Sequence, residues 1–374
     1  VVISEDSVFD KPSKDSAKIN ILKVKDTTVA LGQLAKYYRK RHAMPLITII
    51  GSAGKTTTKD IITEVLSTQN EVLKNFGTFN NHIGIPQTIF KLNRNHKICV
   101  LELGTNHFGE ISYLGKITYP QIAVITNIGA SHLEFFKDIR GVFKEKISII
   151  HHLAGPRIIL LNRDDLLLNK IKLNNKIKIF YFGVNATSDF MASNIFIKDN
   201  KLSFTFNKKH QFYLNTLGKF NVYNALAGIG CGLIFGISIK KIKEALSNFK
   251  FPPQRLNRIN CSRFILLDDT YNSNPLSLKE AIESLVAFKT KGRKILVMGD
   301  MLELGDDSVD FHRQIGDFIA KKPIDMLITL GELSKFTAET LKSEAKDNRQ
   351  ILSFYSKHEL TDFLKRNTKA GDIL

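Results

Sequence analysis

The stretch GSAGKTT at residues 51–57 has the residue types and spacing of a loop that binds phosphate. An apolar run that ends at Ile50 precedes it, and a helical pattern resumes at Lys59. A strand that turns through two glycines into a helix directs several backbone N–H groups to one point, where the helix dipole also favours an anion. We therefore expect nucleotide phosphates to bind at Gly51, Ser52, Ala53, Gly54, Lys55, Thr56 and Thr57.

Two side chains of this loop have an expected chemical task. Lys55 is expected to contact the β and γ phosphates, and the Thr56 hydroxyl to reach a magnesium ion. The loop has two fewer residues between its glycines than the common form G-x-x-x-x-G-K-[ST]. Its position between an apolar strand and a helix nevertheless favours nucleotide binding over a purely structural turn.

Three more polar residues belong to the candidate site. Glu102 ends an apolar strand, and His132 follows another after a turn of small residues, so both are expected at the sheet edge where α/β proteins bind ligands. The alternatives are a solvated edge for Glu102 and a structural role for His132. Lys146 lies in a helix with Lys144 and Glu145, and this pattern by itself predicts a solvated helix face.

The composition limits the class of protein. A chain of 374 residues is long enough for two or three domains. Its net charge of +18 suits polyanionic partners, but the Lys residues are spread along the chain, as is typical of solvated faces. Cys99, Cys231 and Cys261 lack metal-ligand spacing, which fits a reducing compartment. With no secretory signal and no apolar run of membrane-spanning length, we expect a soluble cytoplasmic protein.

Apolar runs that alternate with helical patterns predict two α/β units. Runs such as LITII and KICVLEL are continuous, which indicates parallel strands covered on both faces. Short alternating segments at residues 189–214 predict an antiparallel hairpin beside these strands. A second alternation follows Pro252 and Pro253, which we interpret as an interdomain hinge because paired prolines interrupt both helices and sheets.

The two ends of the sequence have their own features. Val1 rather than Met opens it, and the strand-like AGDIL closes it, so we expect a fragment at both ends. The first 44 residues are too few to bury a core of their own. We expect them to be the last part of another domain.

Seven motifs in one order resemble a known family. They are GSAGKTTTKD, FGTFNNHIGIPQTI, LELGTNHFGEI, ITNIGASHLEFF, GKFNVYNALAGIG, DDTYNSNPLSLKEAI and GDMLELGDDS. Together they resemble the Mur ligase family of ATP-dependent amide-forming enzymes, with matching segments from about Val24 to Leu374. The resemblance implies an α/β fold with a remnant of an N-terminal uridine-nucleotide-binding domain (1–44), a central P-loop parallel-sheet ATPase domain (45–258) and a truncated C-terminal Rossmann-like ligase domain (259–374).

The resemblance also implies roles for the polar residues of the site. Gly54, Lys55 and Thr56 match the family's phosphate loop, and Glu102 matches its magnesium ligand. His132 matches a histidine that helps to hold a second magnesium ion. Lys146 falls at the spacing of a lysine that the family carries as a carbamate, and CO₂ would convert an ammonium that repels a metal into an anion that binds one. The expected catalytic residues are therefore Lys55, His132 and Lys146.

Other matches concern the substrates. Asn224 matches the adenine contact, Arg255 a contact to the nucleotide phosphates and Asp269 the ribose contact. Without the resemblance, Asn224 would be interpreted as a helix-packing polar group and Arg255 as a surface charge. Asn80 and Asn81 match a loop that faces the muramoyl substrate, with turn-forming asparagine as the alternative. The expected pocket for the incoming amino substrate contains Tyr271, Asn272 and Asn274.

The activity that the resemblance implies is the ATP-dependent joining of D-alanyl-D-alanine to UDP-N-acetylmuramoyl-tripeptide in peptidoglycan synthesis, with two Mg²⁺ ions. The alternatives within the class are a sister ligase that adds the third residue and a ligase of the folate-polyglutamate type. A P-loop ATPase stimulated by nucleic acid is a further alternative, which the dispersed Lys residues do not favour. We expect small-molecule partners, no nucleic acid, no membrane span and a monomer.

Overall fold

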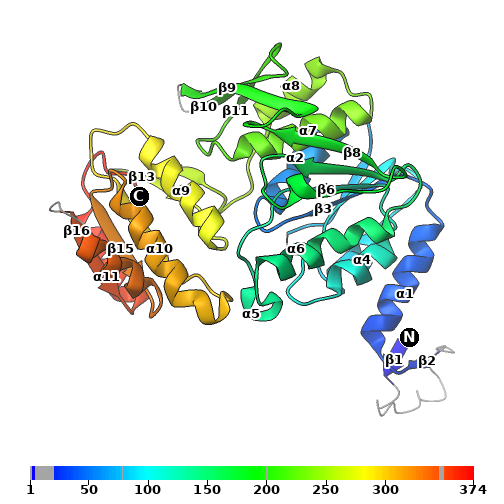
Figure 1. Ribbon diagram of the computed structural model, residues 1–374, viewed down its shortest axis with the longest axis horizontal. Helices are drawn as coiled ribbons and strands as arrows, with labels where there is room; N and C mark the ends of the chain where they lie inside the picture. Colours follow the sequence, from blue (N-terminus) through cyan, green and yellow to red (C-terminus); the bar gives the residue numbers. More distant parts are fainter. Residues whose placement is uncertain (1, 5–20, 78, 199–200, 345–348) are drawn as a thin grey trace, which may run out of the picture.

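The computed structural model describes residues 2–4, 21–77, 79–198, 201–344 and 349–374 (Figure 1). It is a mixed α/β structure with a large sheet and a smaller one, as the alternation of patterns predicts. In Figure 1 the strands and helices of the large sheet lie on the right, and the elements coloured yellow to red lie on the left.

Within the described ranges, nine strands form the large sheet. Neighbouring strands follow the order β11-β10-β9-β8-β7-β6-β3-β5-β4, and every pair from β4 to β9 is parallel. The strands β9, β10 and β11 pair antiparallel, which confirms the expected hairpin. The strands are β3 (Leu46–Ile50), β4 (Val72–Lys74), β5 (Ile98–Glu102), β6 (Ile122–Ile125), β7 (Ile158–Asn162), β8 (Lys178–Gly183), β9 (Phe190–Lys198), β10 (Lys201–Phe206) and β11 (His210–Leu214).

Helices cover both faces of this sheet. All five residues of β3 are buried, and they alternate between two cores, with Ile47 and Ile49 in one and Leu46 and Ile50 in the other. This alternation is the reason that the strand is continuously apolar. One core includes α2 (Lys55–Ser67), α7 (Asn221–Ile234) and α8 (Ile239–Asn248); the other includes α1 (Thr27–Lys40), α3 (Gly84–Ile89), α4 (Glu110–Thr118) and α6 (Ile139–Ile147).

Glycines allow α7 to pack closely on α2. A Cβ on Gly228 would lie 2.4 Å from Cγ2 of Ile61, and one on Gly232 would lie 2.6 Å from Cγ1 of Val65. Any larger residue would therefore separate the two helices. Their close approach brings the N-terminal turn of α7, with Asn224, against the start of α2.

The smaller part of the molecule contains a second parallel sheet. The strands β14, β15 and β16 pair in parallel, and β12 and β13 form an antiparallel hairpin. Ile373 bridges Ile265 and Lys294 in parallel, so the strand-like AGDIL lies between β13 and β14. The elements are β12 (Asn257–Asn260), β13 (Ile265–Asp268), α9 (Pro275–Ala287), β14 (Ile295–Gly299), α10 (Ser308–Ala320), β15 (Met326–Leu330), α11 (Ser334–Glu344), β16 (Gln350–Phe354) and α12 (Lys357–Asn367).

The N-terminal part adds a short pair of strands. β1 (Val2–Ser4) pairs in parallel with β2 (Leu22–Val24), and α1 follows. Most of the first twenty residues lie outside the described part, including the polar stretch after residue 4. No helix in the described ranges has the length and apolarity needed to cross a membrane.

We predict that Gly228→Ala destabilises the protein by about 1–3 kcal/mol, because the added methyl overpacks the contact between α7 and Ile61. Chemical denaturation measures the change. The control is Glu244→Ala on the exposed face of α8, which should stay within about 0.5 kcal/mol of the wild type. An equal effect of the two substitutions would contradict the close-packing argument.

Candidate active site

The strand order places the phosphate loop at a switch point of the large sheet. β3 lies between β5 and β6, so the connections that leave these strands diverge at their carboxyl ends. Open α/β sheets bind ligands in the crevice that this divergence creates. The loop at residues 51–54 follows β3, and Glu102 is the last residue of β5.

Gly54 gives the loop a left-handed backbone conformation. Gly54 has a φ of +77°, and a Cβ at this position would lie 2.6 Å from Oδ1 of Asn224. Asn127, just after β6, holds the loop from the other side. Its side-chain oxygen accepts a hydrogen bond from the N–H of Ala53 at 2.8 Å, and its carbonyl accepts one from the N–H of Ser52 at 3.1 Å.

Lys55 begins α2 and folds back over the loop. Its Nζ donates to the carbonyl of Gly51 at 3.0 Å. Burial lowers the pKa of Lys55, the charge of Glu102 opposes this shift and the charge of Arg255 adds to it. The ammonium thus lies against the loop in a setting that an anion would stabilise.

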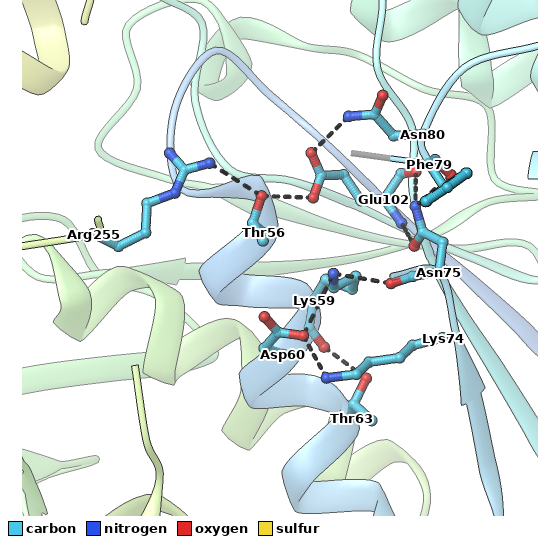
Figure 2. A network of polar contacts seen from close by, with 10 residues as sticks. All are labelled: Thr56, Lys59, Asp60, Thr63, Lys74, Asn75, Phe79, Asn80, Glu102 and Arg255. Carbon is cyan, nitrogen blue, oxygen red and sulfur yellow. Dashed lines mark hydrogen bonds and ion pairs between the residues drawn. The ribbon is translucent and has the colours of Figure 1, made fainter. Parts of the chain in front are cut away.

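Thr56 and Glu102 bring two oxygen donors together (Figure 2). The Thr56 hydroxyl donates to Oε2 of Glu102 at 2.7 Å, and Nδ2 of Asn80 donates to Oε1 of the same carboxylate at 3.0 Å. Nη2 of Arg255 donates to the Thr56 hydroxyl at 3.4 Å. Hydroxyl and carboxylate oxygens are the ligands that Mg²⁺ prefers, so this pair fits a magnesium ion. No group of three or more His, Cys, Asp or Glu side chains in the described ranges could hold a metal ion.

His132 contacts the smaller part of the molecule. It adopts a φ of +54° and immediately precedes α5 (Leu133–Phe136). Its Nδ1 pairs with the carboxylate of Glu303, and the N–H of Glu134 donates to the Glu303 carbonyl at 3.3 Å. Burial lowers the pKa of His132, and the charges of Lys146 and Lys55 add to this shift while Glu303 opposes it. The loop around Glu303 therefore fixes the orientation of this imidazole.

Lys146 is buried, so the solvated face that the helix pattern predicts is wrong at this position. Only 2% of the residue is exposed. Burial, followed by the positive charge of Lys55, lowers the pKa of Lys146 to about 7, while Glu145 opposes the shift. Much of this amine is consequently neutral near physiological pH. As an ammonium it would not fit a metal site, whereas an amine that had captured CO₂ would.

Glu145 is also buried, again against the prediction of a solvated face. Its carboxylate accepts hydrogen bonds from the N–H groups of Gly109 and Ile111, both at 2.7 Å. Gly109 is the N-cap of α4, so an internal carboxylate binds the positive end of this helix. The contact fixes the loop before α4 that lines the cavity.

The linker between the two parts positions Arg255. Gln254 and Leu256, on either side of it, have φ values of +58° and +55°, which side-chain-bearing residues rarely adopt. The Asp269 carboxylate stabilises this conformation by accepting the N–H of Leu256 at 2.9 Å. The Arg255 guanidinium lies 3.7 Å from the centre of the Tyr271 ring, which is a close cation–π contact. The residue expected to be a surface charge on its pattern alone therefore reaches Thr56.

A cavity of about 1220 Å³ lies between these groups, and residues of both parts line it. Gly51 and Lys146 are not among its lining residues. Gly51 provides the carbonyl that Lys55 binds. The charge of Lys55 lowers the pKa of Lys146, and the charge of Lys146 lowers the pKa of His132. The predicted residues that do line the cavity are Ser52, Ala53, Gly54, Lys55, Thr56, Thr57, Asn80, Asn81, Glu102, His132, Asn224, Arg255, Asp269, Tyr271, Asn272 and Asn274.

Asn81, Asn274 and Asn224 line the cavity and also make structural hydrogen bonds. Oδ1 of Asn81 accepts the N–H groups of Ile83 and Gly84, which is the turn-forming role considered as the alternative. Oδ1 of Asn274 caps α9, and Asn224 accepts the Thr58 hydroxyl at 3.0 Å. These bonds hold the asparagines in place at the cavity wall.

Sequence reasoning missed three residues near the site. Asn75 and Lys59 hold the main chain around Glu102, and Glu303 binds His132. Glu303 lies in the GDMLELGDDS motif, which indicated the family but in which no residue was predicted to belong to the site. Asn75 and Lys59 lie in ordinary polar positions after a short strand and inside a helix, so no local pattern singles them out.

The fold and the site together define a class of protein: an α/β nucleotide-binding protein whose phosphate loop faces a second α/β unit. Two family descriptions match the chain, the Mur ligase middle domain at residues 49–232 and the Mur ligase glutamate ligase domain at residues 254–374. The chain belongs to the Mur ligase family.

Curated relatives are similar over most of the chain. The UDP-N-acetylmuramoyl-tripeptide–D-alanyl-D-alanine ligase of Bacillus subtilis (strain 168) is 37% identical over 358 residues, which cover 95% of this chain and 77% of the relative. The ligase of the same name from Escherichia coli (strain K12) is 35% identical over 317 residues, which cover 83% of this chain and 70% of the relative.

Solved structures agree with this relationship. A crystal structure of MurF from Acinetobacter baumannii superposes with a TM-score of 0.88 at 30% identity, covering 100% of this chain and 80% of that one. MurF from Thermotoga maritima in complex with ADP has a TM-score of 0.85 at 26% identity, covering 96% and 82%.

We predict that Glu145→Ala destabilises the protein by about 3 kcal/mol, because it leaves the buried N–H groups of Gly109 and Ile111 without their charged acceptor. Urea unfolding measures the difference. Lys144→Ala on the exposed face of the same helix is the matched control and should have little effect. If Glu145→Ala were as mild as the control, the carboxylate would not be holding α4.

Proposed function

We propose that this protein is an ATP-dependent ligase that joins D-alanyl-D-alanine to UDP-N-acetylmuramoyl-tripeptide. The observation that carries the proposal is the meeting of Lys55, Thr56 and Glu102 at the switch point of the sheet, with Arg255 of the linker donating to the Thr56 hydroxyl. Relatives named for this reaction, and a related MurF solved with ADP, support it.

The reaction requires an activated carboxyl group. A carboxylate resists attack by an amine because it is negatively charged and its oxygen is a poor leaving group. Transfer of the γ-phosphoryl group from ATP to the tripeptide carboxylate releases ADP and gives an acyl phosphate. The free amine of D-alanyl-D-alanine then attacks the acyl carbon through a tetrahedral intermediate, phosphate leaves, and the amide bond remains.

The residues at the phosphate loop bind and orient the triphosphate. Lys55 offsets charge on the transferring phosphoryl group, and the loop N–H groups hold the neighbouring phosphates. Thr56 and Glu102 would hold one Mg²⁺, and His132 with carbamylated Lys146 would hold a second. Bound Mg²⁺ neutralises the developing phosphoryl charge. His132 keeps its orientation through Glu303 of the smaller part.

Other lining residues bind the rest of the substrates in this proposal. Asn224 and Asp269 contact the adenosine moiety, and Arg255 contacts the phosphates. Asn80 and Asn81 face the muramoyl group. The dipeptide pocket contains Tyr271, Asn272 and Asn274.

The domain boundaries, the oligomeric state and the cellular location are also part of the proposal. We propose domain boundaries at residues 44/45 and 258/259; the β12–β13 hairpin begins at Asn257, close to the second boundary. The cavity between the central and C-terminal parts would be closed around the substrates during the reaction, which protects the acyl phosphate from water. We propose that the protein works as a monomer in the cytoplasm and without nucleic acid.

An assay of ADP release tests the function. We expect release only when UDP-N-acetylmuramoyl-tripeptide and D-alanyl-D-alanine are both present, and we expect Lys55→Met to abolish it. Single amino acids in place of the dipeptide test for a sister ligase, and single-stranded nucleic acid tests for a stimulated ATPase. ADP release that depends on neither peptide substrate, or that nucleic acid increases, would contradict the proposal.

Carbamylation of Lys146 predicts a pH-dependent signal. Only a neutral amine captures CO₂, and the pKa of about 7 makes the amine increasingly neutral as the pH rises through that value. With isotopically labelled bicarbonate, a carbamate carbon resonance should be present at a pH well above 7 and be lost below it. Lys146→Met should lack the resonance, whereas Lys144→Met should retain it. A resonance that survives Lys146→Met would assign the carbamate to another lysine.

A further inference from the structure

Asn75 follows β4 and has a fully buried side chain, with 0% of the residue exposed. Its Oδ1 accepts the N–H of Glu102 at 2.9 Å, and its Nδ2 donates to the Glu102 carbonyl at 3.1 Å. Nδ2 also donates to the Phe79 carbonyl at 3.0 Å (Figure 2). One side-chain amide therefore binds both main-chain polar groups of the candidate metal ligand.

This amide continues the sheet where β4 has ended. β4 pairs with β5 only as far as Lys74 and Val100, whereas β5 runs on to Glu102. On its other side the β5 strand pairs with β3, where Glu102 lies opposite Ile49. Without Asn75, the main chain of Glu102 would be held on the β3 side alone, and its buried N–H and carbonyl would lose a partner.

Asn75 also positions Asn80, the residue that donates a hydrogen bond to the Glu102 carboxylate. Because Asn75 holds the Phe79 carbonyl, it fixes the loop that presents Asn80 to Oε1 of Glu102. The carbonyl of Asn80 in turn accepts the N–H of Gly104 at 2.8 Å. The main chain of Glu102 and the donor to one of its oxygens are thus anchored by one residue.

Lys59 connects this anchor to the helix that carries Thr56. Its side chain is buried, with 2% of the residue exposed, and its Nζ donates to the carbonyl of Asn75 at 3.1 Å. Asp60 lies 3.4 Å from the same Nζ and offsets the cost of burying the charge. Contacts therefore run in a closed ring from α2 through Lys59, Asn75 and Glu102 back to Thr56 (Figure 2).

We propose that Asn75 is a positioning residue for metal-dependent nucleotide binding, with Lys59 as its support on α2. It holds Glu102 at the distance and orientation from Thr56 that a Mg²⁺–nucleotide complex requires. Residues that orient a metal ligand commonly change metal affinity about 10- to 100-fold when they are removed. The inference rests on the proposed function, in that Thr56 and Glu102 are taken to bind Mg²⁺.

The test measures the affinity for ADP by calorimetry, once with Mg²⁺ and once with a chelator. The affinity for ADP with Mg²⁺, divided by the affinity for ADP with the chelator, isolates the contribution of the metal. A purely structural defect would weaken both affinities together and leave this ratio unchanged. In Asn75→Ala the ratio should fall about tenfold while the metal-free affinity is retained. Lys59→Met should also lower the ratio, but by less than Asn75→Ala. If Asn75→Ala does not fold, the ratio measured for Lys59→Met tests the positioning role.

Lys74→Met is the matched control. Lys74 pairs with Oδ1 of Asp60 at 2.7 Å, the oxygen that Lys59 also approaches, and its side chain is 39% exposed. Its loss removes a nearby charge but none of the contacts of the ring through Lys59, Asn75, Glu102 and Thr56. Its ratio should equal that of the wild type. Electron paramagnetic resonance of Mn²⁺ in the ADP complex gives a second reading, because a displaced Glu102 changes the spectrum.

Two results would overturn the inference, and they have different meanings. A folded Asn75→Ala or Lys59→Met variant with the wild-type ratio would show that the ring does not position Glu102, and the proposed function would stand. A wild-type protein that binds ADP equally with and without Mg²⁺ would contradict the metal site itself, and the positioning role would fall with it.

Discussion

The structure of the site depends on one carboxylate that is surrounded by buried positive charge. Glu102 receives the Thr56 hydroxyl and the Asn80 amide on its two oxygens. Lys55 and Arg255 lie in its field, and burial lowers the pKa of both. Burying two cations is unfavourable unless enough negative charge lies beside them. A bound polyphosphate supplies that charge, which explains why such an arrangement suits a nucleotide site.

The same electrostatic balance gives Lys146 its chemistry. The ammonium of this lysine has no favourable place near Lys55, and its pKa falls to about 7. Capture of CO₂ would replace a positive charge by a negative one and improve the balance of the whole cluster. Glu145, which precedes Lys146 in α6, accepts hydrogen bonds at the N-terminus of α4 and stabilises the loop there rather than a metal.

The second unit completes the site through two strained connections. Arg255 is held between Gln254 and Leu256, which both have positive φ values, and His132 meets Glu303, where both residues again have positive φ values. Backbone strain of this kind persists only where surrounding contacts impose it. Both connections lie between the parts, so the position of the C-terminal unit determines whether Glu303 reaches His132 and how the linker presents Arg255 to Thr56.

Much of the architecture follows from local patterns. The continuous runs of β3 and β5 indicate buried parallel strands, and the glycines and lysine of residues 51–55 indicate a phosphate loop, because strand burial and loop geometry impose their residue types locally. The pattern around Lys146 fails, since a K-E-K run in a helix is usually solvated and only the packing of α6 against α4 buries Glu145 and Lys146. The bonds of Asn75 to Glu102 and of Glu303 to His132 join positions 27 and 171 residues apart. Such contacts depend on how whole helices and strands pack together. The sequence around a polar residue does not indicate which distant residue will become its hydrogen-bond partner.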